Sequence, residues 1–307
     1  MRKTPERISK KYRLFLAPLI AAFPVAVLCI LVITCALHSD GTTYSLGFLT
    51  YAGKFKYNDV HFLGLSVYWI LMLTGLTLAC LLAASPRRRA QYGFRAGLAV
   101  VFTILAALQG IIGLKVLYAI ERVVRNGSWK ELSFRGQSLF GSLYSSVVLV
   151  PLLALIFRKR ARDMLDFIAP TWLLMLIFTR LGCFQSGCCG GRLMFFGDAP
   201  LSLPVQLFEV ICDLLILSFC LWLDRPGKAP ASRGRDIYPI MLILYGPSRF
   251  LLELLRYNEP FVLGLTGAQL HSIFFFVIGV IWFVCSRGKE SLKKSAGAAE
   301  ATAKAHR

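Results

Sequence analysis

The sequence predicts an all-α, polytopic integral membrane protein with about eight transmembrane helices. Of its 307 residues, 56% are hydrophobic and only 17% are charged, values that soluble domains rarely reach. Runs of about 20 apolar residues can cross a hydrocarbon layer about 30 Å thick. Eight such runs occur in the chain, at Leu14–Leu37, Phe62–Ala84, Ala96–Ile120, Leu139–Phe157, Leu165–Leu181, Val205–Leu223, Ile237–Leu255 and Ala268–Ser286.

The basic residues indicate how these helices are oriented. The formal net charge of +19 would by itself also fit a nucleic-acid-binding protein. However, the two termini and the three connecting segments on the same side contain 24 lysines and arginines, whereas the four segments on the other side contain 7. By the positive-inside rule, both termini are then cytoplasmic. Because the charge is explained by topology, we expect no nucleic-acid partner.

Four regions follow from this pattern. Residues 1–13 are a basic cytoplasmic arm, and residues 14–37 are an extra N-terminal transmembrane helix, because their apolar stretch is longer than that of a cleaved signal peptide. Residues 38–286 form the membrane domain, and no soluble domain is expected. Residues 287–307, which are rich in alanine and lysine, are expected to be a disordered or frayed cytoplasmic tail.

A stripe of polar residues follows the seventh predicted helix. Tyr245, Arg249, Glu253 and Arg256 are spaced by 4, 4 and 3 positions, so they lie on one helical face. An internally paired ladder near the outer interface would explain Arg256. Arg249 lies about two turns deeper, where ionisable groups usually mark a functional site.

Neighbouring spans contribute further polar groups near the outer leaflet. Gln206, Glu209 and Asp213 share one face of the sixth predicted helix, and Arg180 ends the fifth. We expect these helices to enclose a polar chamber. Because arginine offers paired donors, the cationic side of this chamber is suited to a phosphate group.

Lys115 adds a further cation in the third predicted helix. It follows Gly110 and Gly113, whose lack of side chains allows another helix or a lipid headgroup to approach closely. We therefore include Lys115 among the residues expected to bind substrate.

The segment that follows Arg180 contains Cys183, Cys188 and Cys189. A structural zinc site normally has four cysteine or histidine ligands, so these three cysteines alone do not predict a metal. Because the segment is expected outside the cytoplasm, a disulfide that joins Cys183 to one of the other two is an alternative. A third alternative is that the segment lies beside an anionic lipid.

Three segments fit known sequence motifs. Arg180–Arg192 lies on the frame R-[IL]-G-N-F-x-N-G-E-x-x-G-R, with Cys183, Ser186 and Cys188 in place of its asparagines and glutamate. Leu203–Glu209 lies on the box H-P-T-Q-L-Y-E, with Leu203 in place of its histidine. Tyr245–Arg256 fits Y-G-x-x-R-F-x-x-E-x-x-R in full. In these segments, and from about Leu63 to Ile281, the chain resembles the prolipoprotein diacylglyceryl transferase family.

The resemblance implies the fold and the activity of that family. Its members have seven transmembrane helices and an outside N-terminus, so an extra first helix places the N-terminus in the cytoplasm, as the charge pattern requires. The implied enzyme of the bacterial plasma membrane transfers a diacylglyceryl group from phosphatidylglycerol, among the membrane lipids, to the lipobox cysteine thiol of a prolipoprotein signal peptide. Glycerol phosphate is the other product, and no cofactor is implied.

The resemblance also implies roles for individual residues. Arg180 and Arg249 are expected to bind the phosphate, with Tyr245 as a hydroxyl donor beside them, and Glu209 is a further catalytic candidate. The residues expected to bind substrate or to orient the stripe are Lys115, Arg192, Gln206, Glu253 and Arg256.

The chain departs from the family at the position of the proton acceptor. The family's histidine falls on Phe140, which cannot accept a proton, and no other histidine is expected nearby. Glu209, or a Cys188 thiolate beside Arg180, is then the candidate base. The alternative is a family scaffold that uses another lipid acceptor or binds lipid without catalysis. A transporter is less consistent with the sequence, because no internal repeat of broken helices is evident.

Overall fold

The computed structural model describes residues 61–62, 65–134, 136–185, 188–191, 193–196, 199–202, 204–225, 236–256 and 258–305. Within these ranges the secondary structure is helical apart from two short antiparallel hairpins and an isolated bridge between Val262 and Leu265, with loops between the elements. The hairpin strands are β1 (His61–Phe62), β2 (Leu65–Ser66), β3 (Leu193–Phe196) and β4 (Ala199–Ser202). The helices are α2 (Val67–Ala83), α3 (Pro86–Tyr92), α4 (Ala96–Asn126), the 3₁₀ turn η2 (Trp129–Glu131), α5 (Phe140–Ile156), α6 (Ala161–Gln185), α7 (Val205–Leu223), α8 (Ile237–Glu253) and α9 (Gly267–Ala305).

The long helices occupy the predicted spans. Seven of the eight spans coincide with α2 and with α4 to α9, which confirms the all-α membrane fold class. The remaining span, Leu14–Leu37, lies outside the described residues. Four described helices, α4, α6, α7 and α9, are long and apolar enough to cross a membrane by themselves. Helix α2 reaches that length only together with α3, from which it is bent by 62°.

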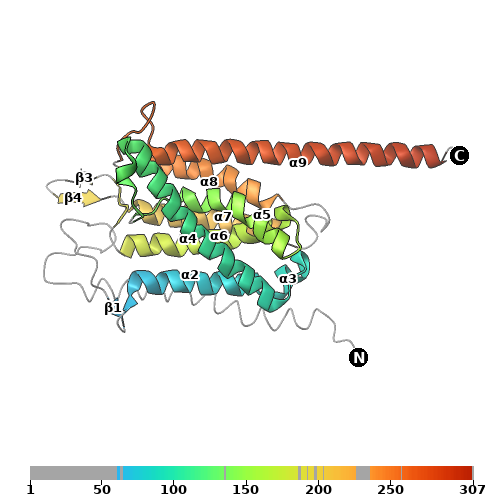
Figure 1. Ribbon diagram of the computed structural model, residues 1–307, viewed down its shortest axis with the longest axis horizontal. Coiled ribbons are helices and arrows are strands. Elements are labelled where there is room, and N and C mark those ends of the chain that lie inside the picture. Colours follow the sequence, from blue (N-terminus) through green and yellow to red (C-terminus); the bar gives the residue numbers. More distant parts are fainter. Residues whose placement is uncertain are drawn as a thin grey trace.

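Helix α6 is the centre of the bundle. In its apolar window 72% of the residues are buried, against 39% in α4, 44% in α7 and 22% in α9. It packs against α2, α5, α7 and α8, while α4 lies diagonally across the bundle and contacts α2 and α5 (Figure 1). The C-terminal part of α6 is therefore enclosed by other helices, which places Arg180 in the protein interior.

Helices α4 and α5 cross at a pair of glycines. A Cβ atom added to Gly113 would collide with the backbone of Gly141, and one added to Gly141 would collide with the backbone of Gly113. The close approach predicted at Gly113 is therefore confirmed, and the group that approaches is a helix.

The two ends of the bundle carry different elements. The strands β1, β3 and β4 lie at one end, and α3 lies at the other (Figure 1). Lys159, which follows α5, donates to the carbonyl oxygen of Gly93 at 2.6 Å, and Arg88 of α3 pairs with Asp224, which follows α7, at 2.8 Å. The three basic connecting segments therefore meet at one end, in agreement with the charge pattern.

Helix α9 extends beyond the rest of the bundle (Figure 1). It begins with a reciprocal capping box, in which Thr266 Oγ1 accepts from the Gln269 N–H at 3.3 Å and Gln269 Oε1 accepts from the Thr266 N–H at 2.9 Å. The helix continues to Ala305, so the tail expected to be disordered or frayed is helical up to that residue. Alanine, lysine and glutamate are strong helix formers, which explains the continuation.

Candidate functional site

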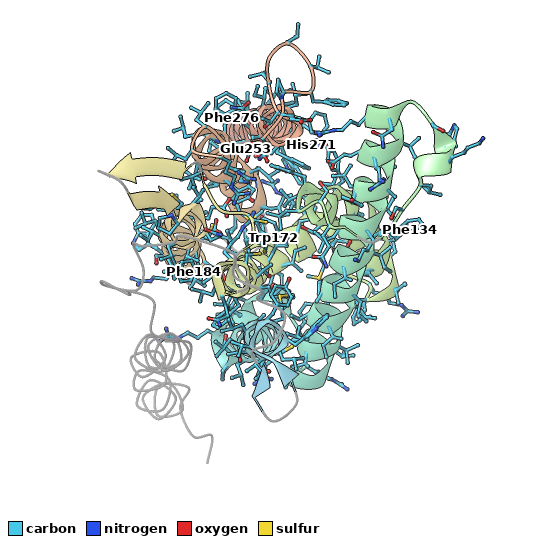
Figure 2. The ribbon with its side chains drawn as sticks, turned by 90° about the vertical axis from the view of Figure 1, so that its left-hand side faces the viewer. Phe134, Trp172, Phe184, Glu253, His271 and Phe276 are labelled. Atoms are coloured by element: carbon cyan, nitrogen blue, oxygen red, sulfur yellow. The ribbon has the colours of Figure 1, made fainter. Side chains whose placement is uncertain are left out.

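Polar residues from three helices come together at the end of the bundle that carries the hairpins. Arg180 lies near the end of α6, Glu209 in the first turns of α7, and Arg249 and Glu253 in the last turns of α8. All four are buried, with 3–6% of their surface exposed. Figure 2 looks onto this end and shows Glu253 on α8, with Trp172 nearer to the centre of the bundle. The predicted polar chamber is therefore present.

Glu209 is the centre of this cluster. Its Oε2 accepts from Arg180 Nε at 2.7 Å and from Arg256 Nη2 at 3.0 Å, and its Oε1 lies 3.4 Å from Arg249 Nε. A buried carboxylate with three guanidinium partners offsets the mutual repulsion of the three cations. Glu209 lines neither of the two cavities at this end, so it contacts the arginines on the side that faces away from the cavities.

Glu253 provides the second anion. Its Oε2 accepts from Arg249 Nη1 at 2.6 Å, and its Oε1 accepts from Asn258 Nδ2 at 2.5 Å and from Thr266 Oγ1 at 3.2 Å. These contacts connect the end of α8 to the start of α9. Arg249 is therefore fixed by two carboxylates, Glu209 and Glu253, while it lines the smaller cavity.

Two cavities meet at Arg180 and Cys189, which line both of them. The larger cavity, of about 550 Å³, lies among α2, α4, α5 and α6, and most of its lining is apolar. The smaller cavity, of about 430 Å³, is lined by the arginines Arg125, Arg180, Arg249 and Arg256 and by the glutamates Glu121, Glu253 and Glu259. These volumes are typical of ligand sites. Both cavities are mainly apolar, and the smaller one adds four arginines and three glutamates, so together they can hold an amphipathic ligand with an anionic group.

Cys183, Cys188 and Cys189 form a second cluster beside Arg180. Their sulfur atoms all lie within 4.8 Å of one another. All three are free thiols, Cys183 buried and the other two exposed, so the disulfide that the sequence allows is not formed in this structure. The Cys188 N–H donates to the Cys183 carbonyl oxygen at 3.1 Å, and Gln206 Nε2 donates to the Cys188 carbonyl oxygen at 2.5 Å. These two bonds fold the segment back over the end of α6.

The surroundings of Cys189 favour its thiolate. Hydrogen bonds with Cys183 and Cys188, followed by the positive charges of Arg180 and Arg256, lower the pKa of Cys189 below the usual value of a thiol. A thiol with a lowered pKa is a better nucleophile and a better metal ligand at neutral pH.

Several predicted site residues lie away from the cavities. Lys115 is half-buried in α4 and lines neither cavity, and the buried Tyr245 and Gln206 also line neither. Tyr245 still lies within electrostatic range of Arg180, so it belongs to the layer behind the arginines. Arg192 lies outside the described residues.

A histidine lies beside Phe140, so the expectation that none would be nearby is wrong. The ring centroid of His271 is 5.2 Å from that of Phe140. Its Nε2 lies 2.9 Å from Glu121 Oε1 and its Nδ1 lies 3.0 Å from the Tyr144 hydroxyl oxygen. His271 and Glu121 both line the smaller cavity. The connection from α8 to α9 brings the chain back to α5, and no local sequence signal reveals that contact.

Comparisons with known proteins agree with this arrangement. The chain matches the family model for prolipoprotein diacylglyceryl transferase over residues 59–285. A Clostridium perfringens protein named phosphatidylglycerol–prolipoprotein diacylglyceryl transferase 2 is 27% identical over 237 residues, which cover 72% of this chain and 91% of that protein. A Clostridium tetani protein named phosphatidylglycerol–prolipoprotein diacylglyceryl transferase is 27% identical over 244 residues, which cover 73% of this chain and 95% of that protein. An Acinetobacter baumannii protein of the same name is 25% identical over 249 residues, which cover 73% and 90% of the two chains. The chain therefore belongs to the prolipoprotein diacylglyceryl transferase family.

Proposed function

We propose that this protein is a phosphatidylglycerol–prolipoprotein diacylglyceryl transferase of the bacterial plasma membrane, with both termini in the cytoplasm. Family membership and the names of the relatives support the class of reaction. The observation that carries the proposal is the pair of adjoining, mainly apolar cavities that meet at Arg180, the smaller of which is also lined by the buried Arg249 and Arg256. The substrates are phosphatidylglycerol and the lipobox segment of a prolipoprotein signal peptide.

The two cavities match the two halves of a phospholipid. The acyl chains occupy the larger cavity, and the phosphate binds to Arg180 and Arg249, with Arg256 close by. Arg180 lines both cavities, so it lies where the glycerol backbone meets the headgroup. When the bond between the glyceryl carbon and the phosphate oxygen breaks, negative charge builds up on the phosphate. Guanidinium groups that are already fixed in place stabilise this charge more in the transition state than in the bound lipid.

The residues behind the arginines position them. Both carboxylate oxygens of Glu209 lie beside guanidinium groups, so we assign Glu209 to the positioning of the arginines rather than to proton transfer. Glu253 fixes Arg249 from the other side, and Tyr245 adds a polar group to the same layer. Gln206 fixes the backbone of the cysteine segment.

A second candidate function is lipid binding without transfer, or transfer to another lipid acceptor. Phe140, at the position of the family's histidine, favours this alternative because a phenyl ring cannot accept a proton. His271 packs against Phe140 and lines the same cavity as the arginines. A proton-accepting side chain is therefore present beside the site, and the transferase is the better supported of the two functions.

Replacement of the host enzyme tests the proposed function. A bacterial host is depleted of its own diacylglyceryl transferase and expresses this protein, its Arg249→Ala variant or its Arg225→Ala variant, in which the altered arginine is exposed after α7. We expect the wild type and Arg225→Ala to restore lipid modification of lipoproteins, and Arg249→Ala to lower it by about 100-fold or more. Unmodified prolipoproteins in cells with normal amounts of the wild-type protein in the membrane would favour the alternative without transfer.

A further inference from the structure

The three thiols beside Arg180 have no role in the proposed binding of the lipid. The sulfur atoms of Cys183, Cys188 and Cys189 lie within 4.8 Å of one another, and all three residues line the larger cavity. Cys189 also lines the smaller cavity. The cluster therefore lies where the lipid headgroup and the acceptor thiol must meet.

The separation of the sulfur atoms fits a small, thiophilic metal ion. Zn–S bonds are about 2.3 Å long, so two sulfur ligands of a tetrahedral zinc ion are about 3.8 Å apart. The sulfur atoms here need to move together by at most about 1 Å to reach this geometry. Thiolates select zinc or copper(I) over magnesium and calcium. The exposed side chains of Cys188 and Cys189 can rotate to complete the site.

The backbone of the segment is shaped for this convergence. The Cys188 N–H and carbonyl groups are fixed by Cys183 and Gln206, respectively. Cys189 has a φ of +61°, a left-handed conformation that is unfavourable for a cysteine and that persists where the surroundings impose it, often at ligand sites.

The charges around the cluster match a zinc centre with three thiolates. Such a centre carries one net negative charge, and Arg180 and Arg256 both lie within electrostatic range of Cys189. Three protein ligands leave the fourth tetrahedral position open, as in catalytic zinc sites.

We propose that Cys183, Cys188 and Cys189 bind one Zn²⁺ ion, whose open fourth position receives the thiol of the acceptor cysteine. Binding of zinc follows from the cluster itself, whereas the acceptor role rests on the proposed function. A thiol that coordinates zinc is deprotonated, so with zinc bound the acceptor thiol needs no protein base at the position of Phe140. Neither the family match nor the names of the relatives mentions a metal.

The proposed step balances without a further reactant. The acceptor thiol gives its proton to bulk water as its sulfur coordinates the zinc. The sulfur then attacks the glyceryl carbon of phosphatidylglycerol that is bonded to the phosphate oxygen. The C–S bond forms as the C–O bond breaks, and the electron pair of the C–O bond leaves with glycerol phosphate. The neutral thioether product is a weaker ligand than a thiolate and leaves the zinc.

Metal analysis of the purified full-length protein tests the binding of zinc. The zinc content is measured for the wild type, for the Cys188→Ser/Cys189→Ser double variant and for Cys212→Ser, whose cysteine lies in α7 outside the cluster. We expect about one zinc ion per chain in the wild type and in Cys212→Ser, and less than about a tenth of that in the double variant. Loading with Co²⁺ alone should give a thiolate-to-cobalt absorption band that only the double variant lacks.

Either of two results would overturn the binding of zinc. The first is wild-type protein that remains free of zinc after exposure to Zn²⁺. In that case its three thiols would react with a thiol reagent equally fast in the presence and absence of the ion. The second is a disulfide within the cluster of the native protein.

Transfer activity of the same samples separates the metal site from the proposed function. Removal of zinc with a chelator should lower transfer to a lipobox peptide by about 100-fold or more, and added Zn²⁺ should restore it. If zinc is bound but its removal leaves transfer unchanged, the acceptor role is overturned and the transferase function stands. If zinc is bound and no sample shows transfer, the binding of zinc is confirmed and the proposed function fails.

Discussion

At the scale of single residues, the site depends on a carboxylate that lines neither cavity. Glu209 of α7 contacts Arg180 of α6, Arg249 of α8 and Arg256 beyond the end of α8. Like charges repel strongly where water is excluded. A shared anion is therefore what allows three guanidinium groups to remain together at the proposed phosphate site.

The substitution Glu209→Gln tests this dependence. The amide keeps the shape of the side chain but leaves three buried cations without their shared counterion, so we expect a loss of about 3 kcal/mol of stability. This corresponds to a fall of the thermal midpoint by about 5 °C or more, measured by thermal unfolding in detergent.

The matched control is Glu259→Gln. Glu259 is 84% exposed and lies 4.0 Å from Arg125, so its substitution should leave the thermal midpoint unchanged. If Glu209→Gln unfolds at the same temperature as Glu259→Gln, the three arginines do not depend on Glu209 and the description of the cluster is wrong.

Some of the site residues can be predicted from the sequence because their relation is local. The stripe of Tyr245, Arg249 and Glu253 follows from helical periodicity within α8. The contact between His271 and Phe140 joins α9 to α5, and helical periodicity contains no information on such a pairing. The burial of Arg88 in α3 cannot be predicted for a similar reason, because its partner, Asp224, lies in a distant connecting segment.

At the scale of elements, the crossing of α4 and α5 forms one wall of the larger cavity. Both helices contribute to its lining, and their close contact is at Gly113 and Gly141. Only glycine allows the two backbones to approach this closely. The crossing therefore fixes the shape of the space in which the acyl chains are proposed to bind.

We predict that Gly141→Ala destabilises the protein, because the added methyl group collides with the backbone of α4. Overpacking of this kind costs about 1–3 kcal/mol. Thermal unfolding and the yield of folded protein should both be lower than in the wild type. Gly97→Ala, in which the added atom meets open space, provides the control and should be as stable as the wild type. Equal stability of the two variants would show that the helices can separate without cost.

Most long elements can be predicted from the sequence, whereas their ends cannot. Apolar runs fix the existence of seven described helices, because length and composition are local properties. Helix α4 continues to Asn126 rather than ending at Ile120, and α9 continues to Ala305. Both extensions are polar, so hydropathy does not report them.

At the scale of the whole molecule, the basic connecting segments meet at one end and the site lies at the other. Contacts such as Lys159 with Gly93 join these segments directly. By the positive-inside rule, we expect the basic end to face the cytoplasm. The proposed lipid site would then lie in the outer half of the membrane.

Reporter fusions test this orientation. A reporter inserted after Arg158 and one fused to the C-terminus should be active only as cytoplasmic reporters, and one inserted after Gly127 only as an external reporter. The physical reason is that basic segments are retained on the cytoplasmic side. The same activity at Arg158 and at Gly127 would contradict a transmembrane path for α5, and reversed activities would contradict the orientation.

Diacylglyceryl transfer at the cavity lined by Arg249 should change the mass of an acceptor peptide. Purified protein in vesicles that contain phosphatidylglycerol is incubated with a lipobox peptide, in parallel with the Arg249→Ala variant. We predict that the peptide gains one diacylglyceryl group on its cysteine and that an equal amount of glycerol phosphate is released. The Arg249→Ala variant should form less product by a factor of about 100 or more. A peptide of unchanged mass, with wild-type protein that still unfolds cooperatively on heating, would show that this site does not carry the transfer.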